Sequence, residues 1–589
     1  MFQSFIYRLI VMAMLDICLI KPARYDDDGY PVQWIRSIMP SNSMACVAGI
    51  VQDAIDRQLL GPEVTIRYHW LDETHSKVDP ARIMRAARKA GARLLIFMVG
   101  VQSNMFPRAV DLARPFLAAG HPVCVGGFHV SGIVSMLKTM PPDLVEAQAL
   151  GISFFAGEAE DGRIDQVIRD GYAGTLAPLY NFIHDQPNLA GAALPVSDKR
   201  ELRRMIYGYS TADLGRGCPF ECSFCTIINV QGRKSRFRTP DDLEAIVRRN
   251  VAEGISGFFL TDDNFARNRG WEGHLDRLIA LRAEGIRVRL VIQVDTLAHR
   301  IPNFIDKCVA AGADQIFIGL ENINADSLES TKKRQNRVEE YRDMFLAWKK
   351  HPVLITCGYI IGFPNDTKES ILRDIEVIKT QMPIDFLYIN YLTPLPGCED
   401  HKKLLDAGVW MDPDMSKYDL NHRVTHHPRM SDAEWEEAFI GAHRSFYEFA
   451  HLKRIMQRMV ALRIHRPKML VHRLLGYRES VLAENVAMLE SGIVRIRRRR
   501  QRRHGLPLES PFVFYPRMVL QALRGTGRMW STFARLKWLM FQVRRAPDRL
   551  AYSDAAIGGS DAAANDALLT ATRTTAHARR RAAGAVKAP

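Results

Sequence analysis

The residues best suited to chemistry are three cysteines packed into eight positions. Cys218, Cys222 and Cys225 are spaced by four residues and then by three. Thiolates are soft ligands that suit iron–sulfur clusters or zinc. A structural zinc site normally closes with four ligands, and no fourth cysteine completes the pattern nearby. A cubane cluster normally takes four thiolates, so three would leave one iron open to bind a substrate or a cofactor.

This segment resembles the CxxxCxxC loop of the radical S-adenosylmethionine (SAM) superfamily. Phe224 stands in the usual aromatic position before the last cysteine, and the loop follows an expected strand, as it does in that family. The resemblance implies a [4Fe–4S] cluster at Cys218, Cys222 and Cys225. In the family, the open iron binds SAM, and one electron cleaves SAM to methionine and a 5′-deoxyadenosyl radical. A small zinc or redox-sensing loop is the alternative reading.

Residues at the ends of later strands are the candidates for contacts with SAM. The resemblance implies such contacts for Phe224 in the loop, Asp262 after the second expected strand and Gln293 after the third. It also implies them for Glu321 at the end of the fourth and Gly362 after the fifth. The family's usual Gly-Gly-Glu is replaced by Thr-Asp-Asp-Asn-Phe after the second strand. The same residues fit a role as caps or turn formers, so both readings stay open.

Short apolar runs alternate with helical patterns through the first 430 residues, which predicts an α/β fold with parallel sheets. The expected strands of the first set cover residues 15–20, 64–70, 94–99, 123–125 and 152–155. Those of the second set cover residues 208–214, 257–260, 288–292, 315–318, 355–361 and 386–391. We expect a doubly wound, Rossmann-like domain over residues 14–200, with Met14 as a possible true start. Six strand–helix units over residues 201–430 predict a partial (β/α)6, TIM-like barrel with its chemistry on the loops after the strands.

The rest of the chain differs in character. Residues 431–550 are expected to form a helical C-terminal region, which opens on a capping-box pattern at Ser431 and Glu434. Residues 551–589 are rich in Ala, Gly and Thr, which predicts a disordered tail.

A doubly wound domain ahead of such a barrel resembles the cobalamin-binding subclass of radical SAM enzymes, the class B methylases. Gly126 and Gly127 match that subclass's glycine pair near the corrinoid nucleotide, and glycine lets a backbone approach a bulky ligand. The resemblance implies cobalamin as a third cofactor and a methyltransferase acting on an unactivated carbon of a small-molecule or lipid-like substrate. The cobalt-ligating motif Asp-x-His-x-x-Gly is missing, since His75 has the wrong spacing. We expect His75 and His129 to be structural.

Other readings remain. A radical SAM cyclase or rearrangement enzyme would not use cobalamin for methyl transfer, and the N-terminal domain would then carry no cofactor. A methylthiotransferase would need a second cluster, but Cys18, Cys46 and Cys124 are scattered and are expected to be buried. The remaining cysteines, Cys308, Cys357 and Cys398, are expected to be structural or incidental. The histidine group His422, His426 and His427 could suggest a metal site, but we do not expect one there.

The charge is high and uneven. The net charge is +15, and residues 495–503 hold seven arginines, which predicts a solvated or anion-binding surface. A nucleic-acid binder or a membrane binder with a structural metal loop would explain this charge, but no nucleic-acid-binding motif accompanies it. Residues 518–543, with Trp530 and Trp538, fit either a basic amphipathic helix on an anionic membrane or a packed core helix.

The cysteine usage favours a reducing compartment, and residues 2–20 lack the pattern of a signal peptide or a membrane span. We therefore expect a cytoplasmic protein that can also lie at the inner membrane face. The family resemblance further implies a reducing electron donor such as a flavodoxin or a ferredoxin.

Overall fold

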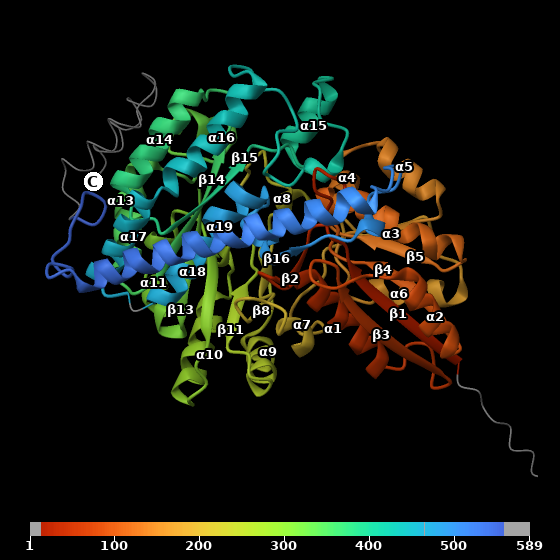
Figure 1. Cartoon of the computed structure of the whole chain (residues 1–589). Coiled ribbons are helices and arrows are strands. Elements are labelled where there is room, and N and C mark those ends of the chain that lie inside the picture. The colour runs from red at the N-terminus through yellow and green to blue at the C-terminus, as the bar shows by residue number, and fades with distance from the viewer. Residues whose placement is uncertain (1–12, 465, 559–589) are drawn as a thin grey trace, which may run out of the picture.

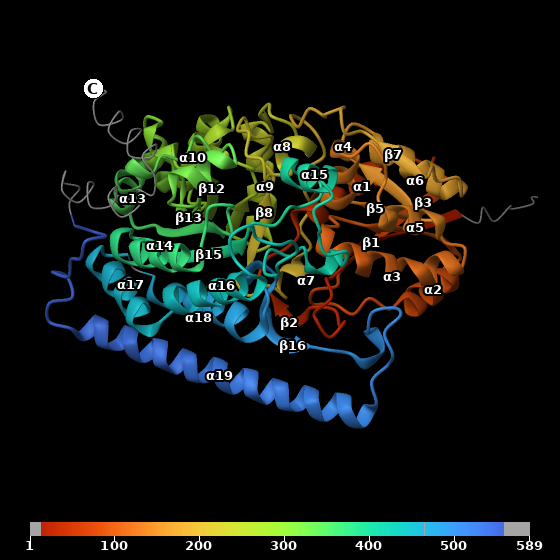
Figure 2. The ribbon, with the colours of Figure 1, turned by 90° about the horizontal axis from the view of Figure 1, so that it is seen from above.

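The computed structural model describes residues 13–464 and 466–558, so the part of the expected tail from 559 onward lies outside the described residues. Two parallel sheets lie side by side, the first built from the N-terminal part of the chain and the second from its middle (Figure 1). Helices of the C-terminal part cover one side of the molecule (Figure 2).

Six parallel strands form the N-terminal sheet, in the order β3-β1-β4-β5-β6-β7. They are β1 (Ala13–Lys21), β3 (Val64–Asp72), β4 (Ala92–Met98), β5 (Val123–Gly126), β6 (Ser153–Ala156) and β7 (Leu179–Asn181). The five strands expected from the apolar runs are confirmed, and β7 adds a sixth.

Helices cover both faces of this sheet. They are α1 (Asn42–Asp56), α2 (Pro80–Lys89), α3 (Phe106–Ala118), α4 (Phe128–Met136), α5 (Pro142–Ala149) and α6 (Arg163–Ala173). Because successive side chains of a strand point to opposite faces, β1 contributes to two cores. Leu15 and Ile17 pack in one core with residues of α1 and α6, whereas Cys18 and Ile20 pack in the other with residues of α3 and α5. Burial on both faces explains why β1 is apolar apart from Asp16, which pairs with Arg67, and the terminal Lys21.

The second sheet also has six parallel strands, in the order β15-β14-β13-β12-β11-β8. They are β8 (Tyr209–Ala212), β11 (Gly257–Leu260), β12 (Arg289–Val294), β13 (Ala313–Glu321), β14 (Leu354–Ile361) and β15 (Phe386–Tyr391). All six expected strands are confirmed. The sheet is open, because β15 and β8 lie at its two edges.

Helices connect these strands. They are α9 (Pro240–Ala252), α10 (Trp271–Ala283), α11 (Phe304–Ala311), α12 (Ala325–Ser330), α13 (Tyr341–Lys349) and α14 (Lys368–Gln381). The start of α9 shows how the sequence sets a boundary. Thr239 accepts a hydrogen bond from the Asp242 N–H, Asp242 accepts one in return, and Pro240 needs no N–H partner in the first turn.

The C-terminal region is helical, as expected, but it also contains a strand. Its helices are α16 (Asp432–Phe446), α17 (Phe449–Ala461), α18 (Pro467–Glu484) and α19 (Pro511–Arg545), and α15 (Glu399–Asp406) precedes this region, after the second sheet. The expected capping box of Ser431 and Glu434 opens α16. The strand β16 (Gly492–Ile496) pairs antiparallel with β2 (Gln33–Ser37), and neither was expected. The domain boundaries at residues 200, 430 and 550 stay predictions.

The arginine block 495–503 corrects the sequence interpretation. Arg500 alone in the block is exposed, and the other residues are half-buried. Arg495 pairs with Asp26 at 3.0 Å and Arg503 pairs with Asp414 at 2.8 Å. The prediction of a solvated or anion-binding surface was therefore wrong, because these arginines fasten the C-terminal segment to the N-terminal and post-barrel loops.

Candidate functional site

The three cysteines lie on a loop at the edge of the second sheet. The strand β8 leads into the short strand β9 (Gly215–Arg216), which pairs antiparallel with β10 (Arg236–Phe237). Between them lie the cysteine loop, residues 217–226, and the short helix α8 (Ile227–Val230). The hairpin therefore holds both ends of the cysteine loop just after the first strand of the second sheet.

The surroundings of the thiols fit an iron–sulfur cluster. Cys222 is buried, and the Gln335 side-chain amide donates a hydrogen bond to its sulfur at 3.4 Å. Burial raises the pKa of the Cys225 thiol to about 12, while the main-chain N–H groups of Ile227 and Ile228 act to lower it. Hydrogen bonds to sulfur stabilise cluster thiolates and tune their potentials. The donors that a bound cluster needs are thus already in place.

The same cysteines fit a single metal ion poorly. In residues 13–464 and 466–558, no three Cys, His, Asp or Glu side chains are grouped so that they could hold one ion. A tetrahedral zinc site would need such a group. In a cubane cluster, by contrast, each thiolate binds a different iron, so its ligands do not converge on one point.

Lys333 is a buried cation beside the cysteine loop that the sequence did not single out. Its ammonium pairs with Glu321 at 2.8 Å and lies 5.8 Å from the centre of the Phe224 ring. Burial alone would lower the pKa of Lys333, but Glu321 and the nearby Cys222 hold it above its usual range. The structure thus joins two predicted residues, Phe224 and Glu321, through a positive charge that faces the thiols.

Asp262 and Gln293 lie together at the ends of β11 and β12. The Gln293 amide donates to the Asp262 carbonyl at 3.3 Å, and the Asn268 amide donates to the Asp262 carboxyl at 2.7 Å. Burial raises the pKa of Asp262 well above its usual value. Its second carboxyl oxygen has no hydrogen-bond partner within the described part of the chain. A buried polar atom without a partner is a candidate ligand contact.

The adjacent Asp263 contacts the cysteine loop directly. Its carboxyl accepts a hydrogen bond from the Gly217 N–H at 2.8 Å, and burial raises its pKa to about 7. The second and first strands of the sheet are therefore coupled at the cysteine loop.

The backbone conformation and the close packing at position 362 both require glycine. Its φ of +92° is one that L side chains rarely adopt, and a Cβ here would lie 2.2 Å from the Trp435 ring. Its N–H donates to Asp366 at 2.9 Å. A contact between Gly362 and SAM stays a prediction.

The glycine pair of the N-terminal sheet lies where two loops approach closely. Gly127 precedes α4 with a φ of +148°, and a Cβ on it would lie 2.2 Å from the Val101 nitrogen. Gly126 ends β5 and is less crowded, with its nearest neighbour at 3.4 Å. The helix α4 that follows packs against α8, at the end of the cysteine loop. The carboxyl edge of the N-terminal sheet therefore adjoins the cysteine loop.

Replacing Gly127 by alanine should destabilise the protein by about 2–4 kcal/mol, because the new methyl group overlaps backbone atoms that cannot move aside. Thermal unfolding measures this loss. Gly120→Ala is the matched control, since Gly120 also has a positive φ, +78°, but nothing lies within 4 Å of its Cβ position. Its cost should stay near 1 kcal/mol. Equal losses in the two variants would contradict this account of Gly127.

Two glutamates after β6 join the two sheets at this edge. The buried Arg216 guanidinium donates to Glu158 at 2.5 Å and to Glu160 at 2.6 Å, and it also pairs with Asp213 at 2.8 Å. Arg236 of the paired strand donates to Glu158 at 2.9 Å. Ion pairs thus connect the N-terminal sheet to the hairpin that carries the cysteine loop.

The histidines have protein partners. His75 contacts Ser37 at 3.0 Å and also pairs with Glu201. His129 contacts Ser103 and Asp143, each at 3.1 Å. Both are buried, which agrees with the structural role expected for them.

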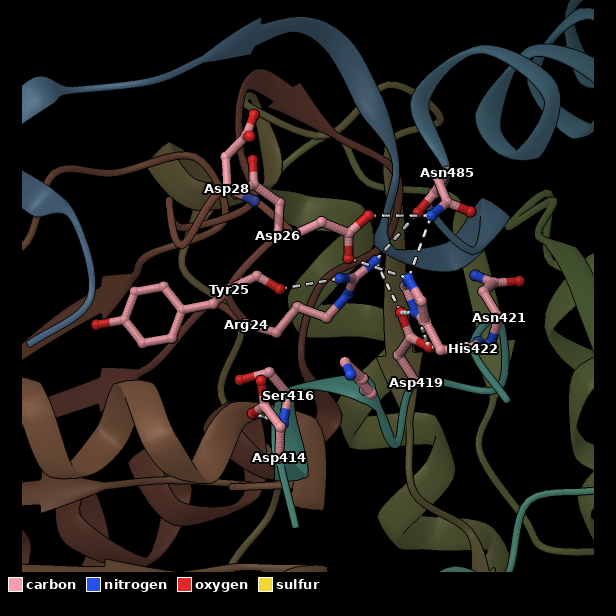
Figure 3. A network of polar contacts seen from close by, with 12 residues as sticks. Arg24, Tyr25, Asp26, Asp28, Asp414, Ser416, Asp419, Asn421, His422 and Asn485 are labelled. Carbon is pink, nitrogen blue, oxygen red and sulfur yellow. Dashed lines mark hydrogen bonds and ion pairs between the residues drawn. The ribbon is translucent and has the colours of Figure 1, made fainter. Parts of the chain in front are cut away.

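The three later histidines do not share a site. His426 pairs with Asp432, and His427 contacts the Phe363 carbonyl at 2.9 Å. His422 belongs to a network that joins three distant segments (Figure 3). The metal role for these histidines therefore gains no support.

This network centres on Arg24, which pairs with Asp419 at 3.0 Å and with Glu490 at 2.6 Å. His422 lies between Asp419 and Asp27, at 2.9 Å and 3.1 Å. Burial acts to lower the pKa of His422, but the two carboxylates raise it to about 9. His422 is therefore a cation at neutral pH.

Stability should fall as the pH rises from about 6.5 to about 9.5. The folded-state pKa of His422 is raised from 6.5 to about 9, so its contribution is complete below pH 6.5 and is lost above pH 9. This shift corresponds to roughly 3 kcal/mol. The unfolding temperature of His422→Gln should vary less over this range than that of the parent. The exposed His504→Gln is the control and should leave the parent's slope unchanged. A parent-like slope in His422→Gln would disprove the assignment.

A cavity of about 660 Å³ lies elsewhere, between α18, β16 and α19. Trp34, Trp530 and Phe533 are among its lining residues, and none of the predicted site residues is. It is therefore separate from the cysteine loop.

Comparisons with known proteins agree with this site. Residues 213–378 match the family model of the radical SAM superfamily. Bacteriochlorophyllide d C-12(1)-methyltransferase of Chlorobaculum tepidum is 28% identical over 246 residues, which make up 41% of this chain and 52% of that protein. Bacteriochlorophyllide d C-8(2)-methyltransferase of the same bacterium is 27% identical over 347 residues, 56% of this chain and 72% of that protein. The chain thus spans about half the length of the first relative.

One solved structure shares the fold over most of the chain. It is TsrM, a radical S-adenosylmethionine methyltransferase from Kitasatospora setae, with its tryptophan substrate and a SAM analogue bound. The match covers 90% of this chain and 100% of that one, with 15% identity and a TM-score of 0.52.

Residues 213–378, which hold the cysteine loop, therefore match the radical SAM superfamily, whose cofactors include a [4Fe–4S] cluster and SAM. The two relatives and TsrM are named as methyltransferases. The resemblance inferred from the cysteine loop is thereby confirmed. In the described residues, no helix is both long and apolar enough to cross a membrane.

Proposed function

We propose that the protein is a cobalamin-dependent radical SAM methyltransferase that methylates an unactivated carbon of a small-molecule or lipid-like substrate. The observation that carries the proposal is the joint edge of the two sheets, where α4 packs against α8 and Arg216 pairs with Glu158 and Glu160. Parallel α/β sheets bind ligands at their carboxyl edges. Two cofactors bound at these facing edges would lie next to each other.

Cys218, Cys222 and Cys225 would hold the cluster. When bound, the cluster and SAM supply a radical that removes a hydrogen atom, and cobalamin supplies the methyl group. Lys333 stabilises negative charge near the thiols, and Gln335 orients Cys222. Further contacts with SAM are proposed for Phe224, Asp262, Gln293, Glu321 and Gly362.

The finer fold assignment belongs to the same proposal. Residues 14–200 would form the Rossmann-like cobalamin-binding domain, in which Gly126 and Gly127 let the backbone approach the corrinoid. Residues 201–430 would form the partial TIM-like barrel, and residues 431–550 the helical domain that covers the substrate.

The partners follow from this chemistry. The enzyme would be cytoplasmic and would receive electrons from a reduced flavodoxin or ferredoxin. Both relatives act, by their names, on bacteriochlorophyllide d.

The test is the metal content of full-length protein purified without oxygen and supplied with cobalamin. About four irons and about one cobalt per chain, with cobalt bound at the N-terminal domain, would support the proposal. Incubation with SAM carrying a labelled methyl group should yield 5′-deoxyadenosine and S-adenosylhomocysteine together once a substrate is supplied. Four irons without cobalt would overturn the cobalamin assignment and leave a radical SAM enzyme of another kind.

A further inference from the structure

The helix α19 has an inner face and a free outer face. It is a single helix of 35 residues that runs along the outside of the molecule (Figure 2). It packs on α17 and α18 through Thr532, Leu536, Met540 and Val543, which are buried at a spacing of four, four and three residues. This spacing places them on one face, so the opposite face points away from the protein.

The outer face carries a continuous apolar stripe. Its residues follow one another at intervals of seven, four, seven and eleven, which return to the same line along an α-helix. They are Phe512 (90% exposed), Val519 (52%), Leu523 (67%), Trp530 (65%) and Phe541 (44%). Single exposed apolar residues are common, but a stripe of this length marks an interaction surface.

The charge of α19 has one sign. Between Pro511 and Arg545 there is no Asp or Glu, and there are seven basic residues. Lys537, Arg544 and Arg545 lie within about 60° of the apolar stripe around the helix axis, so they flank it. All three are exposed. At the C-terminal end, the Arg545 guanidinium lies 4.3 Å from the centre of the Phe541 ring.

We propose that α19 docks the enzyme on an anionic lipid bilayer. The stripe would enter the boundary between headgroups and acyl chains, and Lys537, Arg544 and Arg545 would lie among the lipid phosphates. Aromatic and aliphatic residues on one face with Arg and Lys beside them are the features of helices that lie in this interface. Charge complementarity selects anionic lipid, because each basic residue near such a surface contributes about 1 kcal/mol.

The cavity beside α19 extends the docking surface. Trp530 belongs to the exposed stripe and also lines the cavity of about 660 Å³, together with Arg524 and Arg528. The cavity therefore reaches the face that would meet the bilayer. An apolar lining with basic residues near it suits part of a lipid from the same bilayer.

The experiment is co-sedimentation of the full-length protein with vesicles. Vesicles of equal parts phosphatidylglycerol and phosphatidylcholine should bind the protein at least tenfold more tightly than vesicles of phosphatidylcholine alone. Raising the salt concentration should weaken this binding. Equal binding to both vesicles, or no binding to either, would overturn the proposal.

Two variants separate the parts of the surface. Leu523→Glu with Trp530→Glu places charges in the stripe, and Lys537→Ser with Arg544→Ser removes two of the basic charges that flank it. Each should reduce binding by roughly tenfold or more. The control is Val145→Glu with Leu405→Glu, which changes residues that are 52% and 46% exposed on α5 and α15. It should bind as the parent does.

Iron content and circular dichroism show whether each variant is folded, and these readings do not depend on methyl transfer. If the stripe variant binds vesicles like the parent, α19 is not the docking surface. If the parent forms dimers that the stripe variant does not form, and neither binds lipid, a second copy covers the stripe and the proposal is wrong.

Discussion

Replacing Cys222 by alanine should reduce the iron content from about four per chain to below about one and bring SAM cleavage to background. Cys222 is the middle thiol of the loop, it is buried, and Gln335 donates to its sulfur. An alanine leaves two local thiolates, too few to hold a cubane cluster with one open iron. Iron analysis, electron paramagnetic resonance of the reduced protein and chromatography of 5′-deoxyadenosine measure the effect.

Cys308→Ala is the matched control for this variant. Cys308 is also fully buried, but it lies on α11 within the core of the second sheet. It should keep the iron and the SAM cleavage of the parent. Full iron content in Cys222→Ala, with normal SAM cleavage, would refute the cluster assignment.

Replacing Arg216 by methionine should destabilise the protein by about 3–5 kcal/mol, because three buried carboxylates would lose their shared cation. We expect the first unfolding transition to fall by roughly 5–10 °C. Since Arg216 borders the cysteine loop, cluster loading should fall as well. Calorimetry and iron analysis of the same preparations test both effects.

Arg233→Met is the control for Arg216→Met. Arg233 pairs with Glu221 at 2.6 Å in the same part of the chain, but both side chains are about half exposed, 53% and 52%. An exposed pair contributes only about 0–1 kcal/mol. Adding Glu160→Gln to Arg216→Met should recover part of the loss, because it removes one of the uncompensated charges. If the Arg216 and Arg233 variants lose the same stability, the buried ion-pair network contributes no more than the exposed pair.

The strands that could be predicted from the sequence are those whose own residues form a local apolar run. Residues 15–20 are apolar apart from Asp16 because both faces of β1 are buried, and β14 of the second sheet is a similar run. The strands β2 and β16 give no such signal. They are short, partly exposed and paired with a partner more than 400 residues away, so local periodicity cannot reveal them.

The site shows the same division. The cysteine spacing is local, and the radical SAM superfamily could be recognised from it. Lys333 lies in a basic run, Lys332 to Arg334, that looks like a solvated surface, so its burial beside Glu321 was not predictable. The arginines of residues 495–503 misled for the opposite reason, because their carboxylate partners lie far away in the sequence.

The pairing of β2 with β16 has a consequence for synthesis. Ser37 is opposite Gly492, so about 450 residues separate the partners in the order of translation. At about 5–20 residues per second, β2 leaves the ribosome roughly 20–90 s before the strand that pairs with it. Throughout that interval, the edge of β2 is open to other strands. The pairing of β2 with β16 is therefore among the last steps of assembly, after both parallel sheets have been translated.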